Sequence, residues 1–185
     1  MSLNFEVAGR YQILLVDPPW RYTGSPTKWG AVEKFYATMA DDEIAALPVR
    51  DWLEPRSVVF LWATSPKLDS AIGMICSWGL TYRGVAFVWV KTRRDGKPIG
   101  AQGVRPSIVK PTTEYVLAAS MTARGRPLPL ADEGVAQVVL APRRAHSQKP
   151  EEVQDRIERL YPCTAKAELF ARRRRDGWDC YGDEI

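Results

Sequence analysis

Short apolar runs recur along the chain and predict the strands of a buried sheet. Each run is rich in valine, isoleucine, leucine or aromatic residues. The runs are Ile13–Asp17, Val58–Thr64, Ala86–Lys91, Glu114–Ala119, Gln137–Ala141 and Ala167–Ala171. Continuous apolar segments of this kind are typical of strands that are buried on both faces.

Amphipathic segments between these runs predict helices. One begins at Ser65-Pro66, where a capping serine precedes a proline in the first turn, and ends at Gly79. Another begins near Ser147 and carries Pro150 and two glutamates in its first turn. Both have apolar residues at i, i+4, i+7 spacing: Leu68, Ile72 and Ile75 in the first, and Val153, Ile157 and Leu160 in the second. A shorter helix is predicted at Asp41–Leu47.

The alternation of strands and helices predicts an α/β fold, with a mostly parallel sheet and helices on both faces. Ligands bind such sheets beyond the carboxyl ends of the strands. The length of 185 residues suits one domain, which we expect to span residues 1–185. Polar segments at about 21–34, 92–111 and 143–150 predict mobile loops, and the first two are long enough to be functional lids or surface insertions.

Composition narrows the class of protein. Hydrophobic residues make up 45% of the chain and charged residues 26%, as in an ordinary globular protein. No apolar run reaches the ~20 residues of a membrane-spanning helix, and the N-terminus does not resemble a signal peptide. Three separated cysteines and one histidine, His146, predict reduced thiols in a cytoplasmic protein and no metal site. The net charge of +4 mildly favours a polyanionic partner.

The sharpest local motif is Asp17-Pro18-Pro19-Trp20, directly after the first predicted strand. Pro18 has no amide hydrogen and cannot continue a central strand, so the chain must leave the sheet there. The motif therefore presents a carboxylate, a carbonyl and a large aromatic ring at the carboxyl end of a buried strand. From the spacing alone, an ordinary turn whose tryptophan covers the core is an equal alternative.

Ordered blocks along residues 11–184 resemble the MT-A family of S-adenosylmethionine-dependent adenine N(6)-methyltransferases. The first block is the Asp-Pro-Pro-Trp motif. The others are Phe35–Met39 with Asp42–Ile44, Phe60–Thr64, Trp78-Gly79, Val88–Thr92, His146–Pro150, Ile157–Leu160, Glu168–Arg172, and Gly177-Trp178 with Gly182–Glu184. The resemblance implies a Rossmann-like class I methyltransferase fold with permuted motif order. It also implies S-adenosylmethionine as cofactor and methyl transfer to the exocyclic N(6) amine of adenine in nucleic acid.

The resemblance also implies roles for individual residues. The catalytic motif would be Asp17, Pro18, Pro19 and Trp20. The substrate-binding residues would be Tyr36, Trp89, Lys91 and Ser147. The cofactor-binding residues would be Asp17, Ser147, Lys149, Glu168, Leu169, Phe170, Arg172, Arg174, Asp183 and Glu184, with Lys149 pairing with the methionyl carboxylate.

The chemistry of the reaction explains why such groups would be needed. The adenine amine is a poor nucleophile because its lone pair is delocalised into the ring. Asp17 and the Pro18 carbonyl would accept its two hydrogens and release that lone pair, with roughly 1.5–3 kcal/mol from a hydrogen bond to a charged acceptor. Trp20 or Tyr36 would pack against the base. A sulfonium donor is already activated, so alignment matters more than a strong general base.

The sequence leaves several alternatives open. DNA is favoured over RNA by analogy with compact bacterial or phage members of the family. A non-catalytic nucleic-acid-binding subunit and a methyltransferase for another amine are the competing functions, and a homodimer or heterodimer is compatible with the resemblance. Basic clusters at Arg172–Arg175, at Arg143-Arg144 and between Lys91 and Lys110 predict either phosphate contacts or solvated faces. Arg174-Arg175 replaces a His-Asn pair of a family member and could face phosphates.

Overall fold

The computed structural model describes residues 6–22, 38–99, 109, 111–144, 148–183 and 185. Seven strands of this described part form one sheet. The strands are β1 (Tyr11–Val16), β2 (Leu53–Thr64), β3 (Thr81–Thr92), β4 (Thr113–Ser120), β5 (Val138–Pro142), β6 (Lys166–Leu169) and β7 (Asp179–Tyr181). The α-helices are α1 (Asp41–Ala45), α2 (Leu68–Ser77) and α3 (Glu151–Leu160), and short 3-10 turns cover Val49–Trp52 and Ser65–Lys67.

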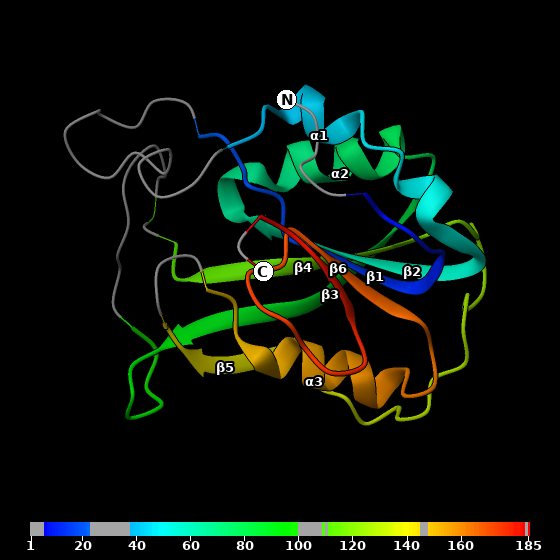
Figure 1. The fold of residues 1–185 in the computed structure, drawn as a ribbon. Coiled ribbons are helices and arrows are strands. Elements are labelled where there is room, and N and C mark those ends of the chain that lie inside the picture. The colour runs from blue at the N-terminus through cyan, green and yellow to red at the C-terminus, as the bar shows by residue number, and fades with distance from the viewer. Residues whose placement is uncertain (1–5, 23–37, 100–108, 110, 145–147, 184) are drawn as a thin grey trace.

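The strands lie side by side in the order β5-β3-β4-β2-β1-β6-β7. Strand β4 runs antiparallel to both of its neighbours, whereas the other neighbouring strands pair in parallel. Helices α1 and α2 cover one face of the sheet and α3 covers the other (Figure 1). This arrangement confirms the predicted α/β class with a mostly parallel sheet, and it agrees with a Rossmann-like methyltransferase fold.

The apolar runs correctly located six strands, and the differences have physical reasons. Strand β3 begins earlier than predicted, at Thr81, because its polar first residues pair with the end of β4, which an apolar run cannot indicate. The predicted helix at Asp41–Leu47 already ends at Ala45. The strand β7 was not predicted, since its three residues are too polar and too few to form an apolar run. Most of the three predicted loops falls outside the described residues.

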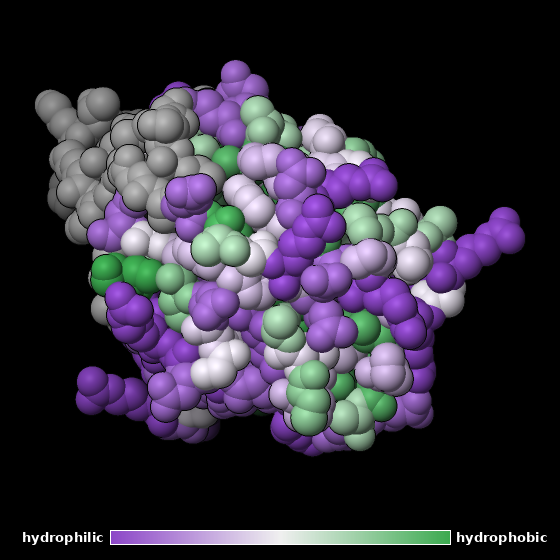
Figure 2. All heavy atoms as spheres, turned by 45° about the vertical axis from the view of Figure 1, so that its right-hand side comes forward, coloured by the Kyte–Doolittle hydropathy of each residue, from purple (hydrophilic) through white to green (hydrophobic). Residues whose placement is uncertain are grey.

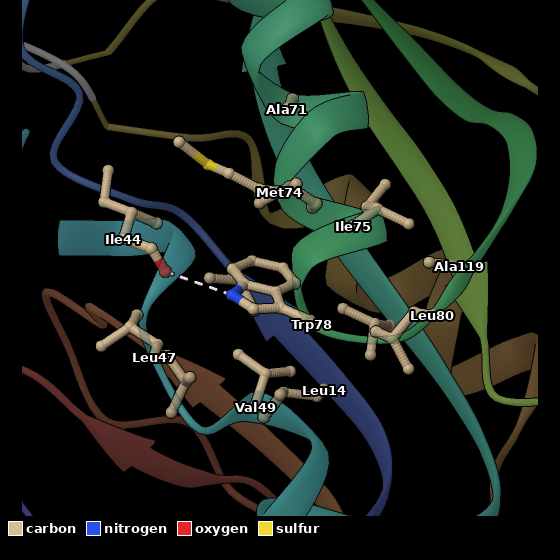
Figure 3. Close-up of a cluster of buried hydrophobic side chains, with 14 of the residues drawn as sticks. Leu14, Ile44, Leu47, Val49, Ala71, Met74, Ile75, Trp78, Leu80 and Ala119 are labelled. Atoms are coloured by element: carbon tan, nitrogen blue, oxygen red, sulfur yellow. Dashed lines mark hydrogen bonds between the residues drawn. The ribbon is translucent and has the colours of Figure 1, made fainter. Parts of the chain in front are cut away.

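Alternation along the strands divides the core into two clusters. On β1, Leu14 and Val16 face α2, whereas Ile13 and Leu15 face α3. On the α2 side, the buried indole of Trp78 donates a hydrogen bond of 3.1 Å to the Ile44 carbonyl (Figure 3). This bond ties α1 to the end of α2, so that both helices cover the same face.

The outer surface agrees with a chain that buries its apolar side chains in these two layers. Figure 2 shows one face on which hydrophilic side chains separate small groups of hydrophobic ones. Among the described residues, no helix is long and apolar enough to cross a membrane.

Candidate active site

The Asp-Pro-Pro-Trp motif leaves the sheet at the end of β1, as predicted. The Asp17 amide donates a long hydrogen bond of 3.4 Å to the Leu169 carbonyl, which is the last link between this strand and β6. Beyond it, the Pro19 carbonyl accepts a bond of 2.9 Å from the Met39 amide, which fixes the outgoing segment. The Asp17 side chain is 16% exposed, and alternation with Ile13 and Leu15 places it on the α3 face.

Asp17 lies at one end of a row in which two carboxylates alternate with two lysines. The Lys149 ammonium lies 2.9 Å from Oδ1 of Asp17 and 3.5 Å from Oε2 of Glu114. The Lys91 ammonium lies 2.6 Å from the other oxygen, Oε1, of Glu114. All four side chains are at least four-fifths buried, so these pairs are weakly screened by water. The result is a continuous row of charges along one edge of the sheet.

Indole rings support both lysines of this row. The Lys149 ammonium lies 5.5 Å from the centroid of the Trp62 ring, and the Lys91 ammonium lies 5.0 Å from that of Trp89. A cation over an aromatic face is attracted by the quadrupole of the ring. The two tryptophans therefore stabilise the positive charges of both lysines without neutralising them.

Glu114 was not among the predicted site residues. The antiparallel direction of β4 brings the beginning of that strand to the edge where β1, β2 and β3 end. Strand direction cannot be deduced from an apolar run, so no sequence pattern indicated that Glu114 lies beside Asp17. The one available signal was a charged residue at the start of an otherwise apolar run.

Glu168 completes the acidic part of the site from β6. Its Cα pairs with that of Leu15, which puts its side chain on the same face as Asp17. Burial, and then the nearby charge of Asp17, raise the pKa of Glu168 to about 7, although Arg173 and Gln154 favour its ionised form. The Gln154 side-chain amide donates a hydrogen bond of 2.8 Å to Oε2 of Glu168. Gln154 was also not predicted to belong to the site.

The pKa values of the other two carboxyls move in opposite directions. Burial raises the pKa of Asp17, and the charges of Lys149 and Arg172 only partly offset it. Burial also disfavours the charged form of Glu114, but the ammonium groups of Lys149 and Lys91 outweigh it and lower its pKa. Glu114 is thus held ionised between two cations, whereas Asp17 and Glu168 compete for the remaining positive charge.

The aromatic residue of the motif lies on the other side of the sheet. Trp20 is 4% exposed, packs in the cluster under α2, and donates its indole N–H to the Trp62 carbonyl at 3.2 Å. Trp89 is equally buried and donates to the Ala141 carbonyl at 2.9 Å. The Pro18 carbonyl already accepts one bond of 2.8 Å from the Trp20 amide. Contact of these three groups with a base stays a prediction.

The predicted cofactor residues after β6 lie on a tight turn beside Asp17. Leu169 is fully buried, and Phe170 adopts a positive φ of 61°, which is unusual for a residue with a side chain. Arg172 acts electrostatically on Asp17. Strand β7 brings Asp183 to this turn, and a Cβ on Gly182 would lie only 2.1 Å from the Ala171 carbonyl oxygen. The predicted residues Tyr36, His146, Ser147 and Glu184 lie outside the described part of the chain.

Two members of the arginine run after this turn form ion pairs with α3, and phosphate contacts of the run stay a prediction. Arg173 forms an ion pair with Glu151. Arg175 pairs with two carboxylates of α3, Asp155 at 2.6 Å and Glu158 at 2.7 Å. The acidic side of α3 lies alongside the run. Arg174 is exposed.

Comparison with known proteins agrees with this geometry. The MT-A70 family model matches residues 11–184. The chain is 32% identical to the Type II methyltransferase M.MunI of a Mycoplasma species, over 95% of this chain and 78% of that relative. It is 31% identical to an N(6)-adenosine-methyltransferase MT-A70-like protein of Drosophila melanogaster, and 28% identical to the human N(6)-adenosine-methyltransferase catalytic subunit METTL3. Both matches include 99% of this chain but less than a third of the relative's own length. The chain therefore belongs to the MT-A70 family of S-adenosylmethionine-dependent adenine N(6)-methyltransferases.

Proposed function

We propose that this chain methylates the N(6) amine of adenine in DNA, with Asp17 as the catalytic carboxylate. The observation that supports the proposal best is the position of Asp17: a nearly buried carboxylate at the carboxyl end of β1, next to the Pro18 carbonyl. Ligands of open α/β sheets bind at this edge. Two acceptors on adjacent residues suit an amine that carries two hydrogens.

The residues of the site fit the cofactor. Burial raises the pKa values of Asp17 and Glu168, and a neighbouring carboxylate adds to each rise, Glu114 at Asp17 and Asp17 at Glu168, so a cationic ligand would suit this site. S-adenosylmethionine carries a sulfonium and an ammonium group, which would supply that charge, and a carboxylate that Lys149 would hold. When bound, it supplies an activated methyl group. Asp183, two residues beyond β7, would approach the ribose hydroxyls.

Asp17 acts on the substrate amine in this mechanism. Its carboxylate accepts one hydrogen of the amine and the Pro18 carbonyl accepts the other, so that the nitrogen lone pair points at the methyl group. With the cofactor bound, the amine nitrogen would take up the methyl group from the sulfonium and would then give up one proton. The buried Asp17 carboxylate, whose pKa is raised, is a suitable group to receive this proton.

The ion pair between Asp17 and Lys149 can open during this step. The Lys149 ammonium lies 2.9 Å from Oδ1 of Asp17, one of the two oxygens that could accept an amine hydrogen. Glu114, only 3.5 Å from the same ammonium, gives Lys149 a second carboxylate when it leaves Asp17. The row of charges therefore allows Lys149 to turn from Asp17 toward the cofactor without becoming an isolated buried cation.

We favour DNA over RNA by analogy with compact bacterial members of the family, such as the Type II methyltransferase to which the chain is 32% identical. Exposed Arg93, Arg94 and Lys97, just beyond the carboxyl end of β3, and exposed Arg174 supply positive charge for phosphates near this edge. A base in duplex DNA would have to leave the stack, at a cost of a few kcal/mol.

The direct test uses tritium-labelled S-adenosylmethionine with duplex DNA, single-stranded DNA, structured RNA and a DNA without adenine. The variant is Asp17→Ala, and the matched control is Asp69→Ala, which removes an exposed carboxylate from the first turn of α2. We expect label in adenine-containing DNA, transfer abolished in Asp17→Ala, and cofactor affinity of that variant within a few-fold of wild type. The Asp69→Ala control should keep full activity.

Other outcomes would select among the alternatives. Labelling of RNA alone would overturn the choice of DNA, and labelling of the DNA without adenine would indicate another amine. Activity retained in Asp17→Ala would refute the role of that carboxylate. If no polymer is labelled and calorimetry detects no cofactor binding, the chain is the non-catalytic subunit. A homodimer or heterodimer stays a prediction, which analytical ultracentrifugation would test.

A further inference from the structure

A buried glutamine links the acidic site to the helix beside it. Gln154 is only 5% exposed, although it lies on α3, a helix with a strongly polar outer side. Its Nε2 donates to Oε2 of Glu168 at 2.8 Å, and its Oε1 accepts from Nη2 of Arg173 at 3.2 Å. Burying a polar amide is favourable only when its hydrogen bonds are satisfied, and these two contacts satisfy both ends.

The guanidinium of Arg173 decides which way this amide points. An arginine side chain has only donors, so the oxygen of the Gln154 amide must face it. The NH2 group is then left to face Glu168. Arg173 is itself held by Glu151 in the first turn of α3, and Glu151 also pairs with Arg144 at 2.7 Å. The ion pairs at the start of α3 therefore orient the Gln154 amide so that its NH2 group donates to the Glu168 carboxylate.

The charges around Glu168 explain why the Gln154 N–H donor matters for its ionisation. Asp17 on β1 and the thiol of Cys180 on β7 are acidic groups that interact with it, and Arg173 and Arg175 are the cations. Both arginines are already paired with carboxylates of α3. The Gln154 N–H adds no charge to the site, and it favours the ionised form of Glu168 by a direct hydrogen bond.

We propose that Gln154 is a positioning residue for cofactor binding: oriented by Arg173, it holds Oε2 of Glu168 so that an ionised carboxylate presents Oε1 to the cationic cofactor beside Asp17. Gln154 does not itself touch the cofactor in this arrangement. The inference rests on the proposed function, because it assigns Glu168 to the cofactor site. It explains why a helix otherwise held by ion pairs buries one neutral amide at this point.

The test compares Gln154→Leu and Gln154→Glu with the wild type. Leucine removes both hydrogen bonds, whereas glutamate keeps an acceptor for Arg173 and replaces the donor toward Glu168 by a second carboxylate. Gln137→Leu and Gln137→Glu are the matched controls, since Gln137 is exposed and its side-chain amide donates to the Val85 carbonyl of β3, at the other end of the strand order from β6. Calorimetry would measure the affinity for S-adenosylmethionine between about pH 5.5 and pH 9, and carbon-13 NMR would follow the titration of Glu168 in ligand-free protein.

In the wild type we expect the affinity to fall as the pH drops through about 7, where Glu168 takes up its proton. Both Gln154 variants should raise the Glu168 midpoint by about one pH unit and lower the affinity near neutral pH by about fivefold. Their affinity should return to within about twofold of the wild type at the highest pH, where Glu168 is ionised in every variant. The Gln137 variants should follow the wild-type curve.

Three results would overturn the proposal, and they are distinguishable. An unchanged Glu168 midpoint in both Gln154 variants would show that the amide does not control this carboxylate. An equal loss of affinity at every pH would show that Gln154 has a purely structural role. Failure of the wild type to bind S-adenosylmethionine at any pH would overturn the proposed function, and this inference with it. Thermal unfolding of each variant identifies one that does not fold, and Gln154→Glu then carries the test.

Discussion

The protein should become more stable as the solution is acidified from pH 8 to pH 5. Burial next to Asp17 raises the pKa of Glu168 from its ordinary value of 4.5 to about 7. Between these two values the folded protein binds a proton that the unfolded chain has released. The stabilisation from Glu168 is therefore complete below the pKa that this group has in the unfolded chain. It is lost as the pH rises through the pKa that the group has in the folded protein. Asp17, whose pKa is also raised, acts in the same direction.

The size of the effect follows from the shift. Each pH unit of difference corresponds to about 1.4 kcal/mol, so a rise from 4.5 to about 7 gives about 3 kcal/mol of lost stability at pH 8. That is a large share of the ~5–15 kcal/mol that holds a typical domain together. Carboxyls such as Glu114, Glu151 and Glu158 have lowered pKa values, so their stabilisation is lost only at more acidic pH, outside this window.

Urea unfolding at half-unit steps between pH 5 and pH 8 measures this dependence for the wild type, Glu168→Gln and Glu158→Gln. We expect Glu168→Gln to match the wild type near pH 5 and to exceed its free energy of unfolding by about 2–3 kcal/mol at pH 8. Glu158→Gln, which removes a partner of Arg175, should be less stable than the wild type throughout. A wild-type stability that is flat, or that rises with pH, while Glu168→Gln shows no gain at pH 8, would refute the assignment.

Three further substitutions test the packing that presents the site. Gly182→Ala would place a Cβ 2.1 Å from the Ala171 carbonyl oxygen, so urea unfolding should show a loss of about 1–3 kcal/mol and calorimetry weaker cofactor binding. Arg156→Ala would uncover two carbonyls on the outer side of the edge strand β5, and light scattering should detect concentration-dependent association with little change in unfolding. Trp78→Phe would remove the indole donor from the buried Ile44 carbonyl, which keeps only the Leu47 amide, and should lower the free energy of unfolding by about 0.5–1.5 kcal/mol, whereas an unchanged value would contradict the role of that bond.

The strands and the position of Asp17 could be predicted because both depend on local sequence. A run such as Val58–Thr64 is too apolar to lie anywhere but inside a sheet, and Pro18 ends a strand whatever surrounds it. Strand β7 is different, because one of the partners that hold it in place is far away in the sequence. The Tyr181 hydroxyl lies 2.7 Å from that of Tyr11, which also donates to Asp179 at 2.7 Å. No pattern within three residues encodes such partners.

The same distinction separates the predicted site residues from those that were missed. Asp17 and Lys149 meet because one ends a strand and the other precedes the helix that covers that strand's face. Glu114 joins them only because β4 runs antiparallel, which depends on pairing with its neighbours. For α3 a signal did exist: Glu151 and Glu158 belong to an acidic stripe, and the chain carries a run of arginines a short distance beyond it. A stripe of one charge and a run of the other predict contact, and Gln154 lies within that stripe.

The charges around Asp17 and Glu168 suit the cationic cofactor of the proposed function. Glu114 is neutralised by two lysines, while Asp17 shares one of these and Glu168 relies on a neutral amide and on arginines that already have partners. Two apolar neighbours in place of Asp17 and Glu168 would pack more stably, since an uncompensated buried carboxylate destabilises the fold. A cationic cofactor offsets this cost when it binds, so part of the binding free energy comes from charges that the fold holds at a disadvantage. The raised pKa values and the affinity for a sulfonium donor then have one cause, which is the placement of two carboxylates on adjacent strand ends.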